Sequence, residues 1–220
     1  PTIPDGTVWF THTDDDAHED TITATYMRDL AAQAGLNTRA VLIDQIGIDA
    51  EGRIVDQDDG LISALFKLYP WEWMAEEAFG QQILPHIADT VWLEPVWKMM
   101  WSNKAVLAIL WEMFPGHPNL LPAYFEPGHL QYYARKPLFS REGANVELID
   151  ASGQRLTEAG PYTDSGYIRQ QLAPLPQFDN NYALIGSWVV GDSAAGICIR
   201  EDNSLITKDS SRFVPHIILD

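Results

Sequence analysis

The sequence predicts an α+β protein in which a small α/β unit precedes a unit dominated by antiparallel strands. In the first ninety residues, strand-like and helix-like patterns alternate, which is typical of a layered α/β unit. After a proline-rich connection at 118–127, the pattern becomes a succession of strands separated by turn residues. We therefore expect one unit over residues 1–96 and a second over residues 97–220.

The predicted elements of the first unit begin with a β-rich segment at residues 7–11. A helix is expected next, because apolar residues recur with helical spacing at Ile22, Tyr26, Leu30 and Ala34. Gly35 and Asn37 are typical of the end of that helix. Further strands are predicted at 38–43 and 61–68, and a helix at 70–79 that begins at a proline.

The second unit is predicted to contain one helix and a single antiparallel sheet. We expect Ser102 to cap a helix that is buried on nearly all sides, and Pro115 to end it. Strands are then expected at 133–139, 146–149, 167–172, 182–190, 194–200 and 205–208. Hairpin turns are expected at Ser152-Gly153, Gly191-Asp192 and Asp202-Asn203.

The charge of the chain bears on its partners. The sequence has 31 acidic and 14 basic residues, a net charge of −17, which disfavours binding to nucleic acid or to an anionic membrane and favours cationic ligands. Its single cysteine excludes an intramolecular disulfide and paired-cysteine metal sites, so we expect a cytoplasmic protein. No run of 18 apolar residues predicts a membrane-spanning helix.

The segment from Ala134 to Val146 is the clearest candidate for chemistry. Lys136 lies in a predicted strand, and a loop of small and polar residues containing Gly143 leads to another strand, so this is not a Walker A loop, which opens a helix. Such a loop can fold over a triphosphate, with its N–H groups and the lysine binding phosphate. A hairpin with solvated charges is the alternative. Lys104, at the start of the predicted helix, could equally bind phosphate or extend its ammonium group into solvent.

Six segments, in order along almost the whole chain, resemble the glutathionylspermidine synthase family of ATP-grasp ligases, and in particular its stand-alone branch of acid–amine ligases. They are residues 66–72, 93–97, 103–107, 110–115, 136–146 and 196–202. The resemblance implies ATP-grasp-type lobes with an antiparallel sheet, preceded by a small pre-ATP-grasp-like α/β unit. It also implies an ATP-dependent acid–amine ligase that joins a carboxylate to an amine through an acyl phosphate.

The resemblance assigns nucleotide-binding roles to several positions. Lys104 and Lys136 match the two nucleotide-binding lysines of the family. The other positions that it implies for ATP are Glu142, Gly143, Gln170, Gln171, Leu172, Ala173, Leu205, Ile206 and Thr207, with Lys208 as a further cation. Without the resemblance, plain sheet core would be the preferred interpretation of most of these positions.

Arg200 is the catalytic candidate, since it matches a family arginine that stabilises the transferred phosphoryl group or the tetrahedral intermediate. A guanidinium group suits this role because it binds two oxygen atoms at once and keeps its proton. The alternative is a salt bridge at the end of a strand, to Glu201 or Asp202.

Three positions are implied to bind substrate. Glu19 and Asp20 align with acidic residues that bind glutathione, although carboxylates at a helix start also stabilise the helix dipole. Leu68 aligns with another glutathione contact but has no polar side chain, which leaves the identity of the acid open. The expected partners are a small-molecule acid and an amine, with a peptide and a polyamine as candidates, and the oligomeric state is left open.

The resemblance also implies Mg²⁺, but the acidic elements that bind it in the family are absent from this sequence. His12 and His18 have no standard metal spacing. We therefore expect no metal ligand here and regard the chain as the C-terminal part of a longer enzyme whose Mg²⁺ ligands lie upstream. The alternatives are an ATP-binding module without ligase activity, acting as a sensor or partner-binding domain, and a structural lobe whose acidic half docks a basic partner.

Overall fold

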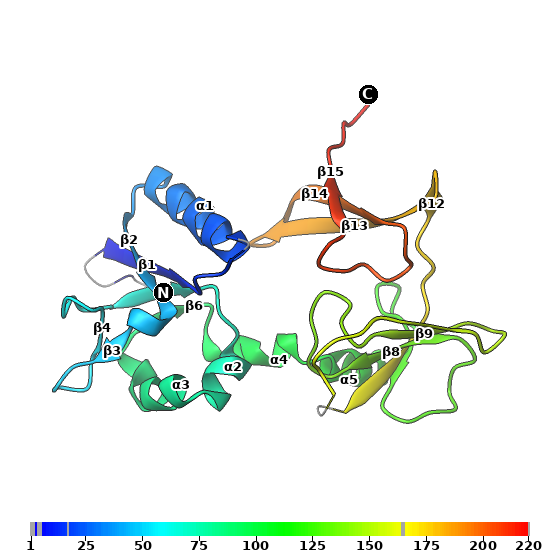
Figure 1. The fold of residues 1–220 in the computed structure, drawn as a ribbon, viewed down its shortest axis with the longest axis horizontal. Coiled ribbons are helices and arrows are strands. Elements are labelled where there is room, and N and C mark those ends of the chain that lie inside the picture. The colour runs from blue at the N-terminus through cyan, green and yellow to red at the C-terminus, as the bar shows by residue number, and fades with distance from the viewer. Residues whose placement is uncertain (1–2, 4–5, 17, 164–165, 220) are drawn as a thin grey trace. The chain divides into compact units, whose positions relative to one another are not determined.

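The computed structural model describes residues 3, 6–16, 18–163 and 166–219, and the chain divides into two compact units, Pro1–Met100 and Trp101–Asp220 (Figure 1). The division lies four residues beyond the position expected from the sequence.

The first unit is built on a four-stranded parallel sheet. Its strand order is β2 (Asn37–Leu42), β1 (Thr7–His12), β5 (Ala64–Lys67) and β6 (Val91–Leu93). Helix α1 (Glu19–Gln33) connects β1 to β2 and lies on one side of the sheet, whereas α2 (Trp71–Glu76) and α3 (Ala78–Ile83) lie on the other (Figure 1). This arrangement confirms the small α/β unit.

Short elements complete this unit. They are the antiparallel pair β3 (Gly47–Ile48) and β4 (Ile54–Val55) and the 3₁₀ turns η2 (Ile43–Gln45), η3 (Leu84–Asp89) and η4 (Val96–Lys98). The short helix α4 (Met99–Ser102) spans the division between the two units.

Aromatic and aliphatic side chains fill the space between this sheet and α2 and α3. Trp9, Leu65 and Trp92 are direct neighbours across β1, β5 and β6, so they share one face of the sheet. They pack with Trp71 of α2 and Ile83 of α3 in one buried cluster. This core holds α2 and α3 against the parallel strands.

One expectation for the first unit is wrong. The helix at 70–79 is broken at Glu77, whose backbone is extended, because α3 turns back onto the end of α2. Gly80 permits this contact: a Cβ there would lie 1.8 Å from the carbonyl oxygen of Met74. The apolar stripe of α1 does not face the sheet, since Ile22 and Tyr26 are 67% and 61% exposed. The small Ala24 is buried instead, which allows close approach of helix and sheet.

The second unit contains two antiparallel sheets and one helix. The five-stranded sheet has the order β10 (Arg155–Thr157), β9 (Glu147–Ile149), β8 (Tyr133–Pro137), β11 (Tyr167–Gln171) and β7 (Ala123–Tyr124). The four-stranded sheet has the order β12 (Gln177–Phe178), β13 (Asn181–Val190), β14 (Ser193–Asp202) and β15 (Arg212–Val214). The single predicted sheet is therefore two sheets.

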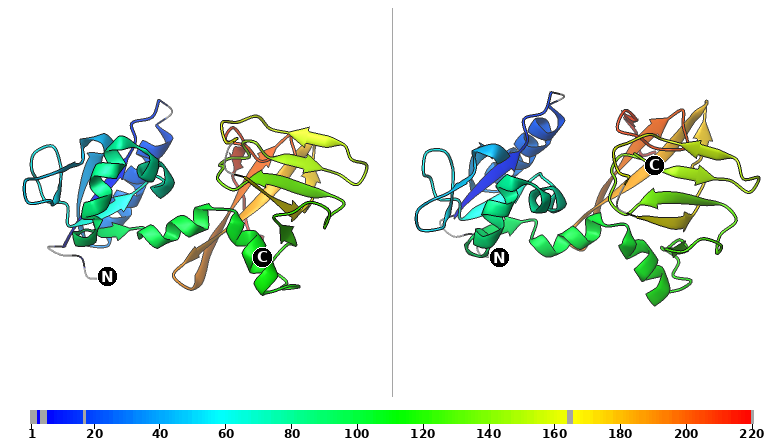
Figure 2. Two further views of the ribbon diagram at one scale, coloured as in Figure 1. Left: turned by 90° about the horizontal axis from the view of Figure 1, so that it is seen from below. Right: turned by 60° about the horizontal axis from the view of Figure 1, so that its bottom comes forward.

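Helix α5 (Ala105–Met113) packs beside β11 and β7 of the five-stranded sheet (Figure 2). Ala108 of the helix forms a buried cluster with Ala123 and Ile168. Ile168 is the direct neighbour of Lys136, and Gln170 is the direct neighbour of Ala134, so all four share one face of the sheet. We call this the inner face. The helix covers one part of it, and the rest lines a cavity.

Three local expectations for the second unit are wrong. Ser102 ends α4 instead of capping α5, because the side-chain oxygen of Asn103 accepts the N–H of Ala105. Helix α5 is not buried on all sides, since Ile109 and Met113 are 46% and 62% exposed. Residues 205–208 do not form a strand. In the part of the chain that the structure describes, no helix is both long enough and apolar enough to cross a membrane.

Candidate functional site

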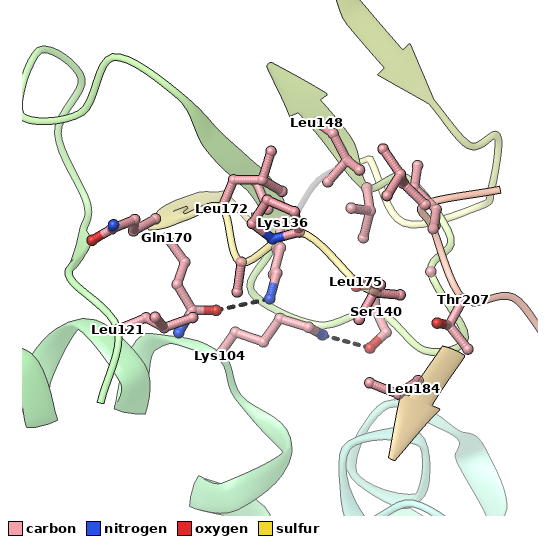
Figure 3. Close-up of a pocket in the computed structure, with 18 of the residues that line it drawn as sticks. Lys104, Leu121, Lys136, Ser140, Leu148, Gln170, Leu172, Leu175, Leu184 and Thr207 are labelled. Carbon is pink, nitrogen blue, oxygen red and sulfur yellow. Dashed lines mark hydrogen bonds between the residues drawn. The ribbon is translucent and has the colours of Figure 1, made fainter. Parts of the chain in front are cut away.

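A cavity of about 300 Å³ lies in the second unit, against the inner face of the five-stranded sheet (Figure 3). The sheet provides Ala134, Lys136, Leu148 and Gln170, and β13 provides Leu184. Eleven of the twelve residues to which the resemblance assigns ATP binding line this one cavity: Lys104, Lys136, Glu142, Gly143, Gln170, Gln171, Leu172, Ala173, Leu205, Ile206 and Thr207. Lys208 is the exception. Segments separated by about a hundred residues thus meet at one place.

Lys136 brings a cation to the inner face without an acidic partner. Its ammonium group donates a hydrogen bond to the side-chain oxygen of Gln170, 2.8 Å away on the neighbouring strand (Figure 3). Desolvation by burial lowers the pKa of Lys136 below its ordinary value. Among the described residues, no carboxylate lies within ion-pair distance of it. Because an unpaired charge is costly to desolvate, this position is suited to an anionic ligand.

Lys104 brings a second ammonium group to the cavity from the start of α5. Its backbone N–H donates to the carbonyl of Leu138 at 2.8 Å, and its side chain donates to the carbonyl of Ser140 at 2.6 Å. Figure 3 shows the side chains of Lys104 and Lys136 reaching into the same space from the helix and from the sheet. Lys104 therefore also holds the start of the loop between β8 and β9.

The loop between β8 and β9 closes one side of the cavity at Gly143. This residue has a φ of 75°, which favours glycine, and a Cβ there would lie 2.6 Å from Ile206 Cγ2 and 2.6 Å from the carbonyl oxygen of Thr207. Ile206 in turn packs against Ala134 and Leu148 of the sheet. The loop and residues 205–207 thus form one continuous wall.

A buried carboxylate, Asp202, organises the segment from 203 to 211 that carries this wall. It accepts the hydroxyl of Ser211 at 2.6 Å and the N–H of Ser204 at 2.9 Å, and the Ser211 oxygen accepts the N–H of Lys208 at 2.7 Å. These side-chain bonds compete with strand pairing, which explains why residues 205–208 are not a strand. Desolvation raises the pKa of Asp202, but these hydrogen bonds and the charges of Lys208 and Arg212 outweigh it and leave the pKa below its ordinary value.

Sequence reasoning did not single out Asp202 as a site residue. Asp202-Asn203 was instead interpreted as a hairpin turn. The available signal was an aspartate followed two residues later by a serine, a spacing at which the aspartate side chain can accept a backbone N–H.

Arg200 lies beside the cavity and does not line it. It is the direct neighbour of Leu184 across β14 and β13, so it projects from the same face of that sheet as a residue of the cavity wall. Its guanidinium group donates to the carbonyls of Lys208 and Asp209, at 2.6 and 3.3 Å. In the described part of the chain it forms no salt bridge with Glu201 or Asp202, and its buried Nε has no hydrogen-bond partner.

Lys208 also lies outside the cavity lining. Its ammonium group is 3.7 Å from a carboxylate oxygen of Glu158. The carbonyl oxygen of Lys208 accepts a hydrogen bond from Arg200. Lys208 therefore contributes to the site through its backbone and not through its ammonium group.

The implied substrate residues lie in the first unit, at the carboxyl edge of the parallel sheet. Asp20 accepts the hydroxyl of Thr13 at 3.1 Å, and Glu19 begins α1, where its N–H donates to Asp15 at 3.0 Å. The N–H of Leu68 donates to the carbonyl of Thr11 at 2.9 Å.

This edge has the topology of a binding site. From β1 the chain crosses to β2 on one side, whereas β5 and β6 add to the other side, and ligands of open parallel sheets bind where the strand order reverses in this way. Thr11, which sequence reasoning missed, is fully buried there, and its hydroxyl oxygen has no partner among the described residues. Nothing in the sequence pattern distinguished Thr11 from its neighbours in a buried strand.

The cavity in the second unit suits a nucleotide. It combines two ammonium groups, a glycine-permitted close approach of backbone and apolar walls from Leu148, Leu172 and Leu184. No cluster of three or more histidine, cysteine or acidic side chains that could hold a metal ion occurs among the described residues.

Comparison with known proteins identifies relatives along almost the whole chain. A family model described as "Glutathionylspermidine synthase preATP-grasp" matches residues 2–219. A protein of Haemophilus influenzae named "Putative acid--amine ligase" is 43% identical over 213 residues, which cover 92% of this chain and 54% of that protein. Trypanothione synthetase of Crithidia fasciculata is 34% identical over 224 residues, covering 90% and 34%. A bifunctional glutathionylspermidine synthetase/amidase of Escherichia coli is 30% identical over 227 residues, covering 91% and 37%. The chain thus spans about a third to a half of these relatives.

Proposed function

The chain belongs to the glutathionylspermidine synthase preATP-grasp family, and we propose that it supplies the nucleotide-binding and substrate-binding parts of an ATP-dependent carboxylate–amine ligase. One observation carries the proposal. Two lysine ammonium groups from different elements reach into one cavity, and that of Lys136 donates to the neutral amide oxygen of Gln170. Lys136 can exchange this neutral partner for a phosphate oxygen, which binds ammonium more strongly.

In this proposal Lys136 and Lys104 bind the phosphates of ATP, and the backbone around Gly143 closes over them. The adenine ring lies against Leu148, Leu172 and Leu184, and the strand end at Gln171 to Ala173 offers main-chain groups to its edge. Gln170 orients Lys136 through their hydrogen bond. Ile206 and Thr207 complete the pocket.

The proposed chemistry has two steps. An oxygen of the substrate carboxylate attacks the γ-phosphorus of ATP, which forms an acyl phosphate and releases ADP. The neutral amine then attacks the acyl carbon, the C–O bond to phosphate breaks, and the products are an amide, inorganic phosphate and a proton. Negative charge builds on the phosphoryl oxygens in the first step, so fixed cations at the cavity lower its barrier.

We assign the transition-state role to Arg200. Its guanidinium group donates to two backbone carbonyls and lies over the ring of Phe213, 5.1 Å from the ring centre, and it has no carboxylate partner among the described residues, so its charge remains for an anionic group. Residues 203–211 hold the guanidinium group in place through the carbonyl of Lys208, and Asp202 fixes that segment.

The substrate class follows from the acidic edge of the first unit. Glu19 and Asp20 would recognise a cationic group, and the names of the relatives point to a glutathione-like peptide as the acid and a polyamine as the amine. Because Leu68 has no polar side chain, the acid substrate can be a peptide other than glutathione.

The test is an assay of ADP formation by the product of the complete gene, with peptides and polyamines supplied singly and together. The proposal predicts ADP formation that requires both substrates and matches amide formation one to one. Arg200→Ala should lower kcat far more than it raises the KM for ATP, because it removes a transition-state contact. Arg155→Ala, an exposed arginine of the same unit, is the control that should change neither. ATP turnover that is independent of acid and amine would overturn the proposal.

A second candidate is an ATP-binding module without ligase activity. The observation that favours it is the lack of a metal-binding cluster among the described residues. In the same assay this alternative predicts ATP binding with no ADP formation under any combination of substrates.

A further inference from the structure

The hairpin of β13 and β14 has an unpaired edge. The short strand β12 pairs only with Asn181 and Tyr182, at the start of β13. Beyond that point, no strand in the described part of the chain lies beside the outer edge of β13. Figure 2 shows the tip of the hairpin extending beyond the other strands of its sheet. The edge of β13 is therefore open from Leu184 to Val190.

The backbone of this edge has hydrogen-bonding groups that point outward. The N–H of Ala183 donates away from β14, to the carbonyl of Pro176 at 3.0 Å. Successive residues of a strand direct their N–H and C=O groups to alternate sides, so those of Ile185 and Ser187 point outward as well. Among the described residues, no strand pairs with them. The edge can thus bind another strand through the main chain of both residues.

The sequence of β13 lacks the features that keep an edge strand unpaired. Natural edge strands are short, or they carry charged residues or proline. Edge strands elsewhere in the described ranges follow this rule: β2 carries Arg39, β10 carries Arg155, β15 carries Arg212, and β6 and β7 have three and two residues. By contrast, β13 has ten residues, none of them charged and none a proline. Such an edge is typical of a strand that has a neighbour on both sides.

Large apolar side chains of β13 are exposed on both faces of the hairpin. Ile185 and Trp188 are each 62% exposed, and they lie on opposite faces because side chains alternate along a strand. Side chains of neighbouring strands lie about 5 Å apart, so a further strand beside β13 would cover part of both. Burial of this apolar surface would stabilise the pairing.

We propose that a strand from the part of the parent protein outside residues 1–220 pairs with β13 between Leu184 and Val190. The chain spans only about a third to a half of the relatives described above, so a long segment is available in proteins of this kind. A segment of the same polypeptide has a high effective concentration at the edge. A second copy of this chain is disfavoured, because each copy has a net charge of −17.

The added strand would also border the nucleotide cavity. Leu184 lines that cavity, and a residue paired with Leu184 has its side chain on the same face of the sheet. The remaining part of the parent protein would thus contribute to the cavity wall. The pairing itself does not depend on the proposed ligase activity.

Hydrogen exchange of the backbone amides, compared between the 220-residue chain and the product of the complete gene, tests the proposal. The amides of Ile185 and Ser187 should exchange on the order of hundredfold more slowly in the complete protein, because they are then hydrogen-bonded within a sheet. The amides of β10, a charged edge strand, are the control and should stay within about threefold. Equally fast exchange of Ile185 and Ser187 in both proteins would overturn the proposal.

Ser187→Pro tests the same edge by removing an outward N–H. A free edge tolerates proline at such a position, whereas a paired strand does not. We expect Tm to fall by about 5 °C or more in the complete protein and to change by less than about 2 °C in the 220-residue chain. Ser187→Thr keeps the N–H and should leave both values within about 2 °C.

Two results of this comparison would contradict the proposal. Equal losses of Tm in the two proteins with Ser187→Pro would mean that the proline disturbs the hairpin itself. A dimer of the 220-residue chain that Ser187→Pro dissociates, measured by gel filtration with light scattering, would show that a second copy occupies the edge.

Discussion

Arg135 and Lys136 are adjacent in β8 and project to opposite faces of the same sheet, yet their environments differ. Arg135 lies 3.6 Å from Glu147, and its guanidinium carbon lies 3.7 Å from the ring centre of Tyr167. Lys136 has only the neutral amide oxygen of Gln170, among the described residues, and a pKa lowered by desolvation. The outer cation has a carboxylate and an aromatic ring of the protein as partners, although its buried Nε has no hydrogen-bond partner among the described residues. The inner cation has one neutral partner, and we propose that it binds a ligand.

The largest effect is expected when the inner face is made to resemble the outer one. Gln170→Glu would give Lys136 a carboxylate partner and place a negative charge beside the proposed phosphates. We expect ATP affinity to fall on the order of hundredfold, because like charges at an interface cost several kcal/mol. Calorimetric titration measures it, and Gln154→Glu, at an exposed position of the same unit that does not line the cavity, is the control. Unchanged affinity in Gln170→Glu would contradict the assignment of the inner face.

A smaller loss is expected when the wall of the cavity is displaced. Gly143→Ala places a Cβ against Thr207 and requires a backbone that costs about 1–2 kcal/mol for alanine. We expect ATP affinity to drop about tenfold. Gly153→Ala has a similar positive φ of 83° with no atom near the new Cβ, so it should reduce stability without changing ATP binding. Equal ATP affinity in the two variants would show that the contact at Gly143 is not part of the site.

Removal of the inner charge should stabilise the ligand-free chain. The pKa of Lys136 is lowered, so its protonated form costs free energy below its folded pKa, and that cost disappears as the pH rises toward the ordinary value of 10.5. Lys136→Met should therefore raise Tm at pH 7, and the gain should shrink at pH 10. Thermal unfolding followed by circular dichroism measures both. A gain that is the same at both pH values would mean that packing, and not charge, is responsible.

The smallest effect is expected on the outer face. Arg135→Gln removes a partly exposed ion pair, which is worth about 0.2–1 kcal/mol, and Glu147 keeps Arg155 at 3.0 Å. Urea unfolding should show this modest loss of stability. A fall of several kcal/mol in the free energy of unfolding would contradict the assignment of Arg135 to a weak, partly exposed ion pair.

Much of the fold could be predicted because its signals are local. Strand β1, the position of α1 and the long strands β13 and β14 follow from alternation, helical spacing and the turn at Gly191. The direction in which α1 faces could not be predicted, because its apolar residues point away from the sheet and the small Ala24 lies against it. Which face of α1 is buried depends on how closely the helix and the sheet approach each other. The residue pattern of the helix alone carries no information on that distance.

The residues of the candidate site could be predicted more completely than their conformation. The family resemblance named the residues of the cavity, but periodicity alone treated Leu205 to Lys208 as a strand. Their actual conformation depends on Asp202 and Ser211, nine residues apart, whose hydrogen bond is a tertiary contact. Thr11 was missed for a similar reason, since a buried threonine in a strand gives no sign that its hydroxyl group will lack a partner.

We propose that the inner face of the five-stranded sheet binds the phosphates of ATP. Calorimetric titration with ATP of two variants of the 220-residue chain, Lys136→Ala and Arg135→Ala, tests this proposal. Each variant removes one positive charge from the same strand, but from opposite faces of the sheet. Loss of the Lys136 contact should cost about 1.5–3 kcal/mol, roughly a tenfold to hundredfold drop in affinity, whereas Arg135→Ala should stay within about twofold of the parent chain. Equal affinities in the two variants, whether both reduced or both unchanged, would contradict the claim.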